Sequence, residues 1–338
     1  MTNNQTWVLR ARPVGDIKDN DLELVESPLG ELADGHVRVK TIYLSLDPTN
    51  RIWMSDADAY LPPVEIGEGM RGGSIGVVVE SRFEQVAEGA IVNTGLAEWA
   101  RYNDVPGAMA NVLPAIPGLP LTAFMGPLGA TGMTAYFGLT DIGKPKAGDT
   151  LVVSAAAGAV GSMVGQIGKI HGCRVVGIAG SDEKCQWLTE KAGFDAAINY
   201  KTQDVGAALD THCPDGIDIN FENVGGEIMD AVIARLNDFS RMPLCGLISG
   251  YNDTDATPGP YNFGNLLMRR TLVKGFIILD YLDRFPEGMQ AMAGWLMEGR
   301  INFETDIVEG LENAPASLER LFTGKNLGKL VVRVSDEP

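Results

Sequence analysis

Several patterns that mark particular protein classes are missing from this chain of 338 residues. It contains no run of 18 apolar residues, and its first stretch, MTNNQTWVLRARP, lacks the charged-then-apolar pattern of a signal peptide. Cysteine is scarce, and the few residues present form no close CxxC pair: Cys173, Cys185, Cys213 and Cys245. They predict reduced, mostly buried thiols rather than a disulfide framework. These absences together predict a soluble, cytoplasmic protein.

Positive charge is also in short supply. The chain has 27 Lys and Arg residues against 44 Asp and Glu residues, which gives a formal net charge of −17. Such a surface repels phosphate backbones and anionic lipids, so nucleic acid and membrane are excluded as main partners. The remaining composition, 45% hydrophobic and 21% charged, is that of a globular protein large enough for two domains.

The order of segments changes along the chain and predicts its domains. Over residues 1–126, short alternating segments such as HVRVKTIYL are separated by Pro and Gly, which predicts a small β-rich domain with Arg38 on a polar face. Over residues 127–300, apolar strands alternate with helices, which predicts an α/β fold with a parallel sheet covered on both faces. Residues 301–338 return to strand, helix and strand, and we expect them to fold back onto the β-rich domain.

The stretch LVVSAAAGAVGSMVGQIG, residues 151–168, is typical of a dinucleotide-binding turn. Such a turn needs three small residues: one for the tight turn, one for close approach of the pyrophosphate, and one for packing of helix on strand. Here these are Ala156, Gly158 and Gly161. A strand precedes the turn and a helix begins within it, so the helix N-terminus offers partial positive charge to a phosphate. The alternative is that the glycines serve packing alone.

The end of the following strand indicates which dinucleotide is bound. A carboxylate there would bind the ribose hydroxyls of NAD and repel a 2′-phosphate. The strand ends GIAGSDEK, with Gly180 and Ser181 where the acid would stand. Asp182 and Glu183 fall in the first turn of a helix, where the dipole favours acids. Lys184 is placed to reach back to a phosphate unless it is a solvated surface lysine, so the sequence favours NADPH over NADH.

Several motifs in order resemble one family. The string AAAGAVGS…VGQIGKIHGCRVVGIAGSDEK, with NYKT, FENVGG, CGLISGYN and GKNLGK, is similar to the zinc-independent branch of the medium-chain dehydrogenase/reductases. Within it, the chain resembles the prostaglandin/leukotriene reductases, alkenal double-bond reductases and bacterial curcumin reductases over nearly its whole length. The resemblance implies a Rossmann domain, doubly wound, and a GroES-like catalytic domain. Many relatives carry an aromatic residue where this chain has Thr49.

The resemblance also implies site residues at matching positions. The pyrophosphate turn matches Gly158, Ala159, Val160 and Gly161, and the 2′-phosphate end matches Lys184 and Tyr200 beside Gly180 and Ser181. The remaining cofactor contacts follow later strands or lie in the returning tail: Asn223, Cys245, Gly246, Ile248, Ser249, Tyr251, Phe276, Ile277, Ile278 and Asn326. Tyr251 matches a tyrosine near the substrate carbonyl, and Tyr60 is a second candidate for the substrate pocket.

The distribution of metal-binding residue types bears on the chemistry. Zinc dehydrogenases of this fold take Cys, His and carboxylate ligands from the first domain. Residues 1–172 contain no cysteine and only two histidines, His36 and His171. We therefore expect no metal cofactor.

Without a metal, a C=C bond conjugated to a carbonyl is an easier target than an isolated carbonyl. Hydride adds to the β-carbon, and negative charge develops on the carbonyl oxygen, where one hydrogen-bond donor lowers the barrier. Tyr251 can supply that donor, and the α-carbon then takes a proton from water or a phenol. Alternatively, Tyr251 only shapes its loop, and Tyr60 only packs beside Pro62 and Pro63.

These observations predict an NADPH-dependent reductase of α,β-unsaturated ketones and aldehydes. A quinone reductase with the same cofactor site and a non-enzymatic NADPH-binding protein remain as alternatives. The segment LVKGFIIL, residues 272–279, is expected to be the last strand of the nucleotide domain, and an open apolar edge invites pairing. Relatives close this edge with a second copy, so we expect a homodimer.

Overall fold

The computed structural model describes residues 3–338 and divides into two compact units. Unit 1 consists of the chain up to Met125, Asp306–Lys325 and Leu330–Pro338. Unit 2 consists of Gly126–Thr305 and Asn326–Lys329. The sequence-based boundaries stood at 126/127 and 300/301, and they assigned the whole tail to one domain. In the structure, residues 301–305 and the four-residue piece Asn326–Lys329 of that tail belong with unit 2.

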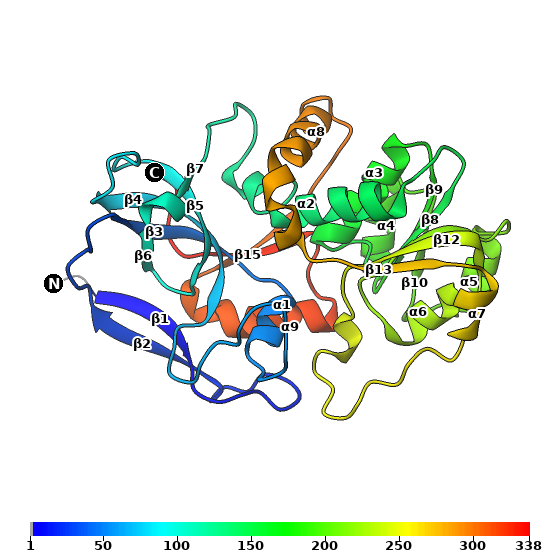
Figure 1. Cartoon of the computed structure of the whole chain (residues 1–338), viewed down its shortest axis with the longest axis horizontal. Coiled ribbons are helices and arrows are strands. Elements are labelled where there is room, and N and C mark those ends of the chain that lie inside the picture. The colour runs from blue at the N-terminus through cyan, green and yellow to red at the C-terminus, as the bar shows by residue number, and fades with distance from the viewer. Residues whose placement is uncertain (1–2) are drawn as a thin grey trace. The chain divides into compact units, whose positions relative to one another are not determined.

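Unit 2 is built on one six-stranded parallel sheet (Figure 1). Its strands are β8 (Thr150–Val153), β9 (Arg174–Ala179), β10 (Ala196–Asn199), β11 (Ile217–Phe221), β12 (Leu236–Leu244) and β13 (Leu272–Gly275). They lie in the order β10-β9-β8-β11-β12-β13, and all neighbours run parallel. This is the doubly wound Rossmann order, in which the winding direction reverses between β8 and β11.

Helices connect these strands and cover both faces of the sheet. The helices between strands are α3 (Ala159–Ile170), α4 (Asp182–Glu190), α5 (Val205–His212), α6 (Gly226–Ile233) and α7 (Gly264–Met268). Figure 1 shows α3 and α6 on opposite sides of the sheet. This follows from right-handed crossovers, because the chain moves in opposite directions from β8 and from β11. Two further helices, α2 (Ala130–Phe137) and α8 (Phe285–Met297), pack against each other, and α2 packs against α3.

The core of unit 2 lies between its sheet and helices. All four residues of β8 are buried, and Val152, Val176, Ile198 and Ile217 join one cluster with residues of α5 and α6. Continuous apolar runs of this kind are typical of parallel strands that are covered on both faces. The core thereby fixes the positions at which the loops leave the strands.

Unit 1 contains the antiparallel strands. A hairpin of β1 (Asn3–Leu9) and β2 (Leu22–Pro28) stands beside a larger sheet of order β14-β15-β3-β4-β5-β7, with β6 paired to β3. The larger sheet consists of β3 (His36–Ser45), β4 (Arg71–Ser81), β5 (Ile91–Glu98), β6 (Tyr102–Pro106), β7 (Asn111–Val112), β14 (Thr305–Glu309) and β15 (Lys329–Arg333). The returning tail joins this sheet because β15 pairs antiparallel with β3. The α-helices in the described part of unit 1 are α1 (Thr49–Trp53) and α9 (Ala314–Thr323).

Two local predictions were wrong. Arg38 in β3 is only 7% exposed rather than on a solvated face, because its guanidinium pairs with Asp104 at 2.7 Å and Glu80 at 3.0 Å. The strand expected over residues 272–279 ends at Gly275, and a 3₁₀ helix follows over Ile278–Arg284. The Phe276 ring instead packs edge-on against Phe221, with 6.3 Å between ring centroids.

Candidate functional site

The site residues predicted in unit 2 follow the carboxyl ends of its strands. In a parallel sheet these ends share one edge, and ligands bind there where the winding direction reverses. Loops leave this edge after β8, β9, β10, β11 and β12. The structure therefore brings the loops that carry most of the predicted cofactor residues to one edge of one sheet.

The turn after β8 has the geometry of a phosphate-binding turn. Ala155, rather than Ala156, takes the left-handed conformation, with φ of 47°, and its carbonyl accepts a 3.0 Å hydrogen bond from the Gly158 N–H. A Cβ on Gly161 would lie 2.5 Å from the Ala155 oxygen and 2.9 Å from the Ala156 Cα. Both are backbone atoms that cannot yield, so glycine is required at 161 for the helix to approach the strand.

The N-terminus of α3 is open to an anion. Gly158 is the N-cap residue, and no side chain caps the helix. The backbone N–H groups of the first turn, which include those of Ala159 and Val160, have no intrahelical acceptor. Together with the helix dipole they form a site for a phosphate, so this turn fits a dinucleotide pyrophosphate.

The returning tail lies beside this turn. Gly328 donates its backbone N–H to the Ala157 carbonyl at 2.8 Å and forms a bridge with Gly158. The Asn326 amide, only 7% exposed, donates to the Gly328 carbonyl at 3.1 Å. The structure therefore places Asn326 next to the phosphate turn within unit 2.

The end of β9 carries no acidic side chain. A Cβ on Gly180 would lie 2.9 Å from the Tyr200 ring, so the glycine leaves room for that ring. Ser181 caps α4, and its hydroxyl accepts the Lys184 N–H at 3.3 Å. The nearby Asp182 carboxylate accepts a 2.7 Å hydrogen bond from Asn199 and is thus engaged by its own unit. The arrangement accommodates a 2′-phosphate.

The loops after β11 and β12 are joined by backbone hydrogen bonds. Ile248 donates its N–H to the Asn223 carbonyl at 3.2 Å. Ser249 donates both its N–H and its hydroxyl to the Val224 carbonyl, at 3.0 and 2.6 Å. The Asn223 side chain in turn donates to the Ser154 carbonyl at 2.8 Å, which links the two loops to the start of the phosphate turn.

Tyr251 closes the second of these loops. Its phenol oxygen accepts the Leu247 N–H at 3.2 Å and lies 3.2 Å from the position of a Cβ on Gly246. Glycine at 246 thus leaves room for the phenol. The bond from Leu247 uses an oxygen lone pair and not the hydroxyl proton. Burial, and next the charge of Glu222, raise the pKa of Cys245 in this loop to about 12, so its thiol stays neutral.

The segment Phe276–Ile278 leaves β13 at the same edge of the sheet. The Phe276 ring stacks edge-on against Tyr281 as well as Phe221, with 6.4 Å between the Phe276 and Tyr281 centroids. Ile277 and Ile278 remain partly exposed.

Tyr60 belongs to unit 1. Its hydroxyl is hydrogen-bonded to the Thr49 hydroxyl, and burial raises its pKa although the residue is 42% exposed.

No group of three or more His, Cys, Asp or Glu side chains that could hold a metal ion occurs within residues 3–338. His36 is partly exposed, with its Nδ1 atom 3.1 Å from the Asp34 carbonyl oxygen. His171 packs against Trp295, and burial lowers its pKa. In the same range, no helix has the length and apolar character needed to span a bilayer.

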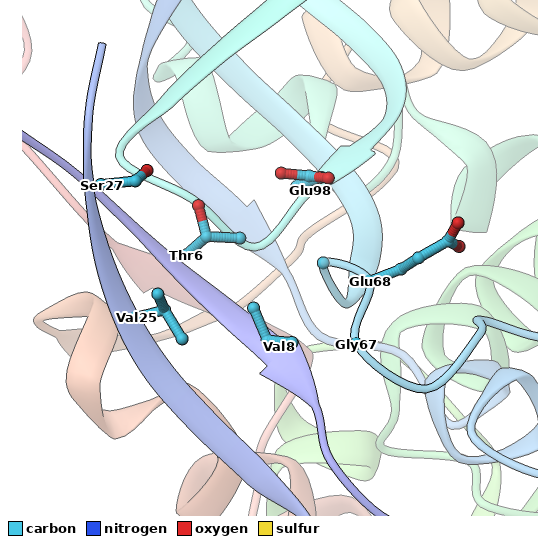
Figure 2. Close-up of a pocket in the computed structure, with 8 residues that line it drawn as sticks. Thr6, Val8, Val25, Ser27, Gly67, Glu68 and Glu98 are labelled. Atoms are coloured by element: carbon cyan, nitrogen blue, oxygen red, sulfur yellow. The ribbon is translucent and has the colours of Figure 1, made fainter.

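A surface pocket of about 480 Å³ lies in unit 1 and contains none of the predicted site residues (Figure 2). It is lined by Thr6, Val8, Val25, Ser27, Gly67, Glu68, Gly69 and Glu98. Burial and then the charge of Glu68 raise the pKa of Glu98. Its wall carries two hydroxyl and two carboxyl side chains and no cationic one, so it does not suit a phosphate-bearing cofactor.

Two residues of the edge were missed from the sequence, Ser154 and Glu222. Both are fully buried and are hydrogen-bonded to each other at 2.9 Å. The available signal was the acidic residue directly after the buried Phe221 in GIDINFENVGG, at the end of an expected strand. A carboxyl group at the end of a buried strand must find hydrogen-bond donors there.

Comparison with known proteins gives consistent matches. Two family models match, one described as the N-terminal domain of oxidoreductase over residues 5–113 and one as zinc-binding dehydrogenase over residues 159–294. The chain is 44% identical to the NADPH-dependent curcumin reductase of Escherichia coli, over 99% of this chain and 98% of that protein. It is 38% identical to the NADP(+)-dependent 2-alkenal reductase of Nicotiana tabacum, over 99% of this chain and 98% of that protein. The crystal structure of CurA from Vibrio vulnificus with NADPH matches with a TM-score of 0.92 and 44% identity, over 98% of this chain and 100% of that one.

Proposed function

Because this chain belongs to the medium-chain dehydrogenase/reductase family, in the group of the NADP-dependent curcumin and 2-alkenal reductases, we propose that it reduces the C=C bond of α,β-unsaturated ketones and aldehydes. It is an NADP-dependent oxidoreductase, and NADPH is its cofactor. The observation that carries the proposal is the edge of the unit 2 sheet. There a phosphate turn, a β9 end without an acid and the Tyr251 loop follow strands of one sheet.

The residues along this edge fit the cofactor. The turn from Gly158 to Gly161 holds the pyrophosphate through the backbone N–H groups of Ala159, Val160 and Gly161. Lys184 with Tyr200 holds the 2′-phosphate. The wall around the nicotinamide is formed by Asn223, Cys245, Gly246, Ile248, Ser249, Tyr251, Phe276, Ile277 and Ile278. Asn326 adds a contact from the tail beside the turn.

The bound cofactor supplies a hydride, and the side chains of the protein manage the charge that follows. Tyr251 donates its hydroxyl proton in a hydrogen bond to the substrate carbonyl oxygen, where negative charge develops. The Leu247 N–H, which the phenol oxygen accepts, holds the ring in place and polarises its O–H group. The α-carbon takes its proton from water or from this phenol.

Tyr60 contributes the substrate-binding side chain of unit 1. Its hydrogen bond with Thr49 replaces the bulk of an aromatic ring by two small polar groups. A pocket wall of this kind admits wider substrates than a second aromatic ring would allow.

We also propose a homodimer formed through β13. This strand ends the six-stranded sheet, and all four of its residues are exposed. Large apolar side chains are exposed beside it as well, including Leu267 at 74%, and a surface pocket of about 560 Å³ lies between Phe263 and Thr271. Pairing with a second copy would complete the sheet and cover this surface. Light scattering at micromolar concentration should give twice the mass of one chain.

The experiment that tests the activity is a substrate screen. NADPH consumption is measured with enals, enones, curcumin-like dienones and quinones under identical conditions. We expect turnover on the conjugated C=C substrates to exceed that on quinones. Faster turnover on quinones would favour the quinone reductase, and tight NADPH binding without turnover on any acceptor would contradict the enzymatic role.

A further inference from the structure

Glu222 is an acidic residue buried at the centre of the candidate site. It directly follows β11 and has no exposed surface. Its Oε1 atom accepts three hydrogen bonds, from the Ser154 hydroxyl at 2.9 Å, the Val224 N–H at 2.7 Å and the Gly225 N–H at 2.8 Å. Its Oε2 atom accepts one from the Asn220 amide at 2.9 Å. All four donors are neutral groups.

The backbone of the same residue reaches the next loop. The Glu222 carbonyl accepts the Cys245 N–H at 2.9 Å and the Gly246 N–H at 3.1 Å. Its own N–H donates to the Pro243 carbonyl at 3.0 Å. Glu222 therefore contacts the loops after β8, β11 and β12, which leave neighbouring strands at the carboxyl edge of the sheet.

These three loops carry the proposed cofactor contacts. Ser154 immediately precedes the phosphate turn, and its hydroxyl also accepts the Asn223 N–H at 2.8 Å. One chain of hydrogen bonds thus runs from the Glu222 carboxyl through Ser154 to Asn223. The segment that begins at Cys245 leads to Tyr251. A displacement of the carboxyl group would move the loops after β8 and β11 relative to each other, and it would reach the loop after β12 through the Glu222 main chain.

Burying a carboxyl group at this position costs free energy that a purely structural residue would not need to cost. Burial raises its pKa, which means that the surroundings disfavour the charged form in spite of the four donors. An apolar side chain would have a smaller desolvation penalty on burial. It would, however, leave the Val224 and Gly225 N–H groups without this acceptor. Such costs concentrate at functional sites.

We propose that Glu222 is a positioning residue for the cofactor: its carboxyl group ties the loop after β8 to the loop after β11, and its main-chain carbonyl, held in place by that anchored side chain, fixes the start of the loop after β12. It acts without touching the cofactor. The proposal rests on the proposed function, because it takes NADPH as the ligand of this edge.

The test compares three variants of the full-length protein. Glu222→Leu removes the acceptor at similar volume, whereas Glu222→Gln keeps the Oε1 atom with its three donors. Asp218→Asn is the matched control, because Asp218 is a carboxylate of the same strand that accepts the Thr150 N–H at 2.8 Å and the Asn237 amide at 2.9 Å, away from the loops at the carboxyl edge. Dissociation constants of NADPH and of adenosine 2′-monophosphate are measured by fluorescence titration and by calorimetry, on variants shown by circular dichroism to be folded.

Glu222→Leu should weaken NADPH binding roughly 10- to 100-fold, because it leaves buried donors unpaired. Binding of adenosine 2′-monophosphate should stay within about threefold of wild type in every variant, because this probe lacks the pyrophosphate and the nicotinamide and depends on Lys184 and Tyr200 rather than on the three loops. Glu222→Gln and Asp218→Asn should both keep NADPH affinity within about threefold. Selective loss of NADPH with rescue by glutamine is not the pattern of general structural damage.

Other outcomes overturn the proposal. A folded Glu222→Leu variant with wild-type NADPH affinity would exclude a positioning role, as would equal loss of affinity for NADPH and for adenosine 2′-monophosphate. If Glu222→Leu does not fold, Ser154→Ala breaks one link of the same chain and should weaken NADPH roughly 3- to 10-fold, and no weakening would refute the proposal. Failure of the wild-type protein to bind NADPH would instead refute the cofactor assignment itself.

Discussion

The two ends of the candidate cofactor site are built differently. At the ends of β9 and β10, recognition depends on exposed or half-exposed side chains, with Tyr200 39% exposed beside Gly180. At the ends of β11 and β12, the loops are fixed by backbone hydrogen bonds and by the buried Glu222. Single surface substitutions at the β9 and β10 end can change which cofactor is preferred. A substitution at the β11 and β12 end would instead move several loops.

This difference separates cofactor choice from catalytic geometry. A charge at the exposed end adds or removes affinity for a 2′-phosphate without disturbing the fold. In the proposed mechanism, the buried end holds the hydrogen-bond donor near the substrate carbonyl, which requires loops that are fixed by many hydrogen bonds. Substitutions at the two ends should therefore have separable effects on affinity and on turnover.

The largest effect on cofactor binding is expected at Gly161, because the phosphate turn lies between the two ends and both depend on its geometry. In Gly161→Ala the new Cβ would lie 2.5 Å from the Ala155 oxygen, so helix and turn must move apart. We expect a loss of about 1–3 kcal/mol in the free energy of unfolding. NADPH and NADH binding should fall together by roughly 100-fold or more. Urea unfolding and fluorescence titration measure these changes.

The matched control for this prediction is Gly259→Ala. A Cβ at that position has no heavy atom within 4 Å and no strained φ, so stability and binding should stay close to wild type. Tight NADPH binding by Gly161→Ala would mean that the turn after β8 does not hold the pyrophosphate.

The exposed end is tested by Lys184→Ala. A charge-assisted hydrogen bond contributes about 1.5–3 kcal/mol, so the Michaelis constant for NADPH should rise roughly 10- to 150-fold. Kinetics with NADH should hardly change, because NADH lacks the 2′-phosphate. The exposed Lys191, at the end of the same helix, provides the control variant Lys191→Ala. Equal losses for both cofactors would contradict the assignment of this end.

The buried end is tested by Tyr251→Phe. The ring remains, so NADPH affinity should stay nearly unchanged, while the donor needed for the developing enolate charge is lost. Since a water or a cofactor hydroxyl can partly substitute, we expect kcat on an enone to fall roughly 10- to 100-fold. Tyr261→Phe is the control, because Tyr261 is 90% exposed. Full kcat in Tyr251→Phe would assign the tyrosine to loop packing and make Tyr60 the next residue to test.

The smallest expected effect is a change with pH in the stability of the buried end, at Glu222. Burial raises the pKa of Glu222 above its value in the unfolded chain. Ionisation of this group is therefore less favourable in the folded state, so its contribution to stability is greatest at low pH and declines as pH rises through the folded pKa. Glutamine does not ionise. The stability of Glu222→Gln relative to wild type should increase from pH 4 to pH 8, as measured by thermal unfolding. A constant difference would mean that the carboxyl group does not titrate in this range.

Much of the fold was predictable because local patterns carry it. The alternation of apolar strands and helices predicted the Rossmann sheet, which is confirmed, and the spacing of Gly158 and Gly161 predicted the turn after β8. The family resemblance predicted from AAAGAVGS, FENVGG and the other motifs is also confirmed. These features depend on residues close together in the sequence.

The rest depends on contacts between distant segments. The burial of Arg38 follows from Asp104 and Glu80, which no pattern around residue 38 reveals. The early end of β13 follows from the ring contact of Phe276 with Phe221. The role of Ser154 is visible only once β8 and β11 are neighbours, because its hydrogen bonds cross from one strand end to the other.

The most direct test of the account follows the hydride. NADPH deuterated at C4, prepared with the label on either face of the ring, is supplied with an α,β-unsaturated ketone, and the product is analysed by NMR and mass spectrometry. The account predicts that one of the two labelled cofactors yields a saturated ketone with a single deuterium on the β-carbon and the carbonyl intact. Deuterium on the carbonyl carbon of an allylic alcohol, or a reduced product without label from either cofactor, would contradict it.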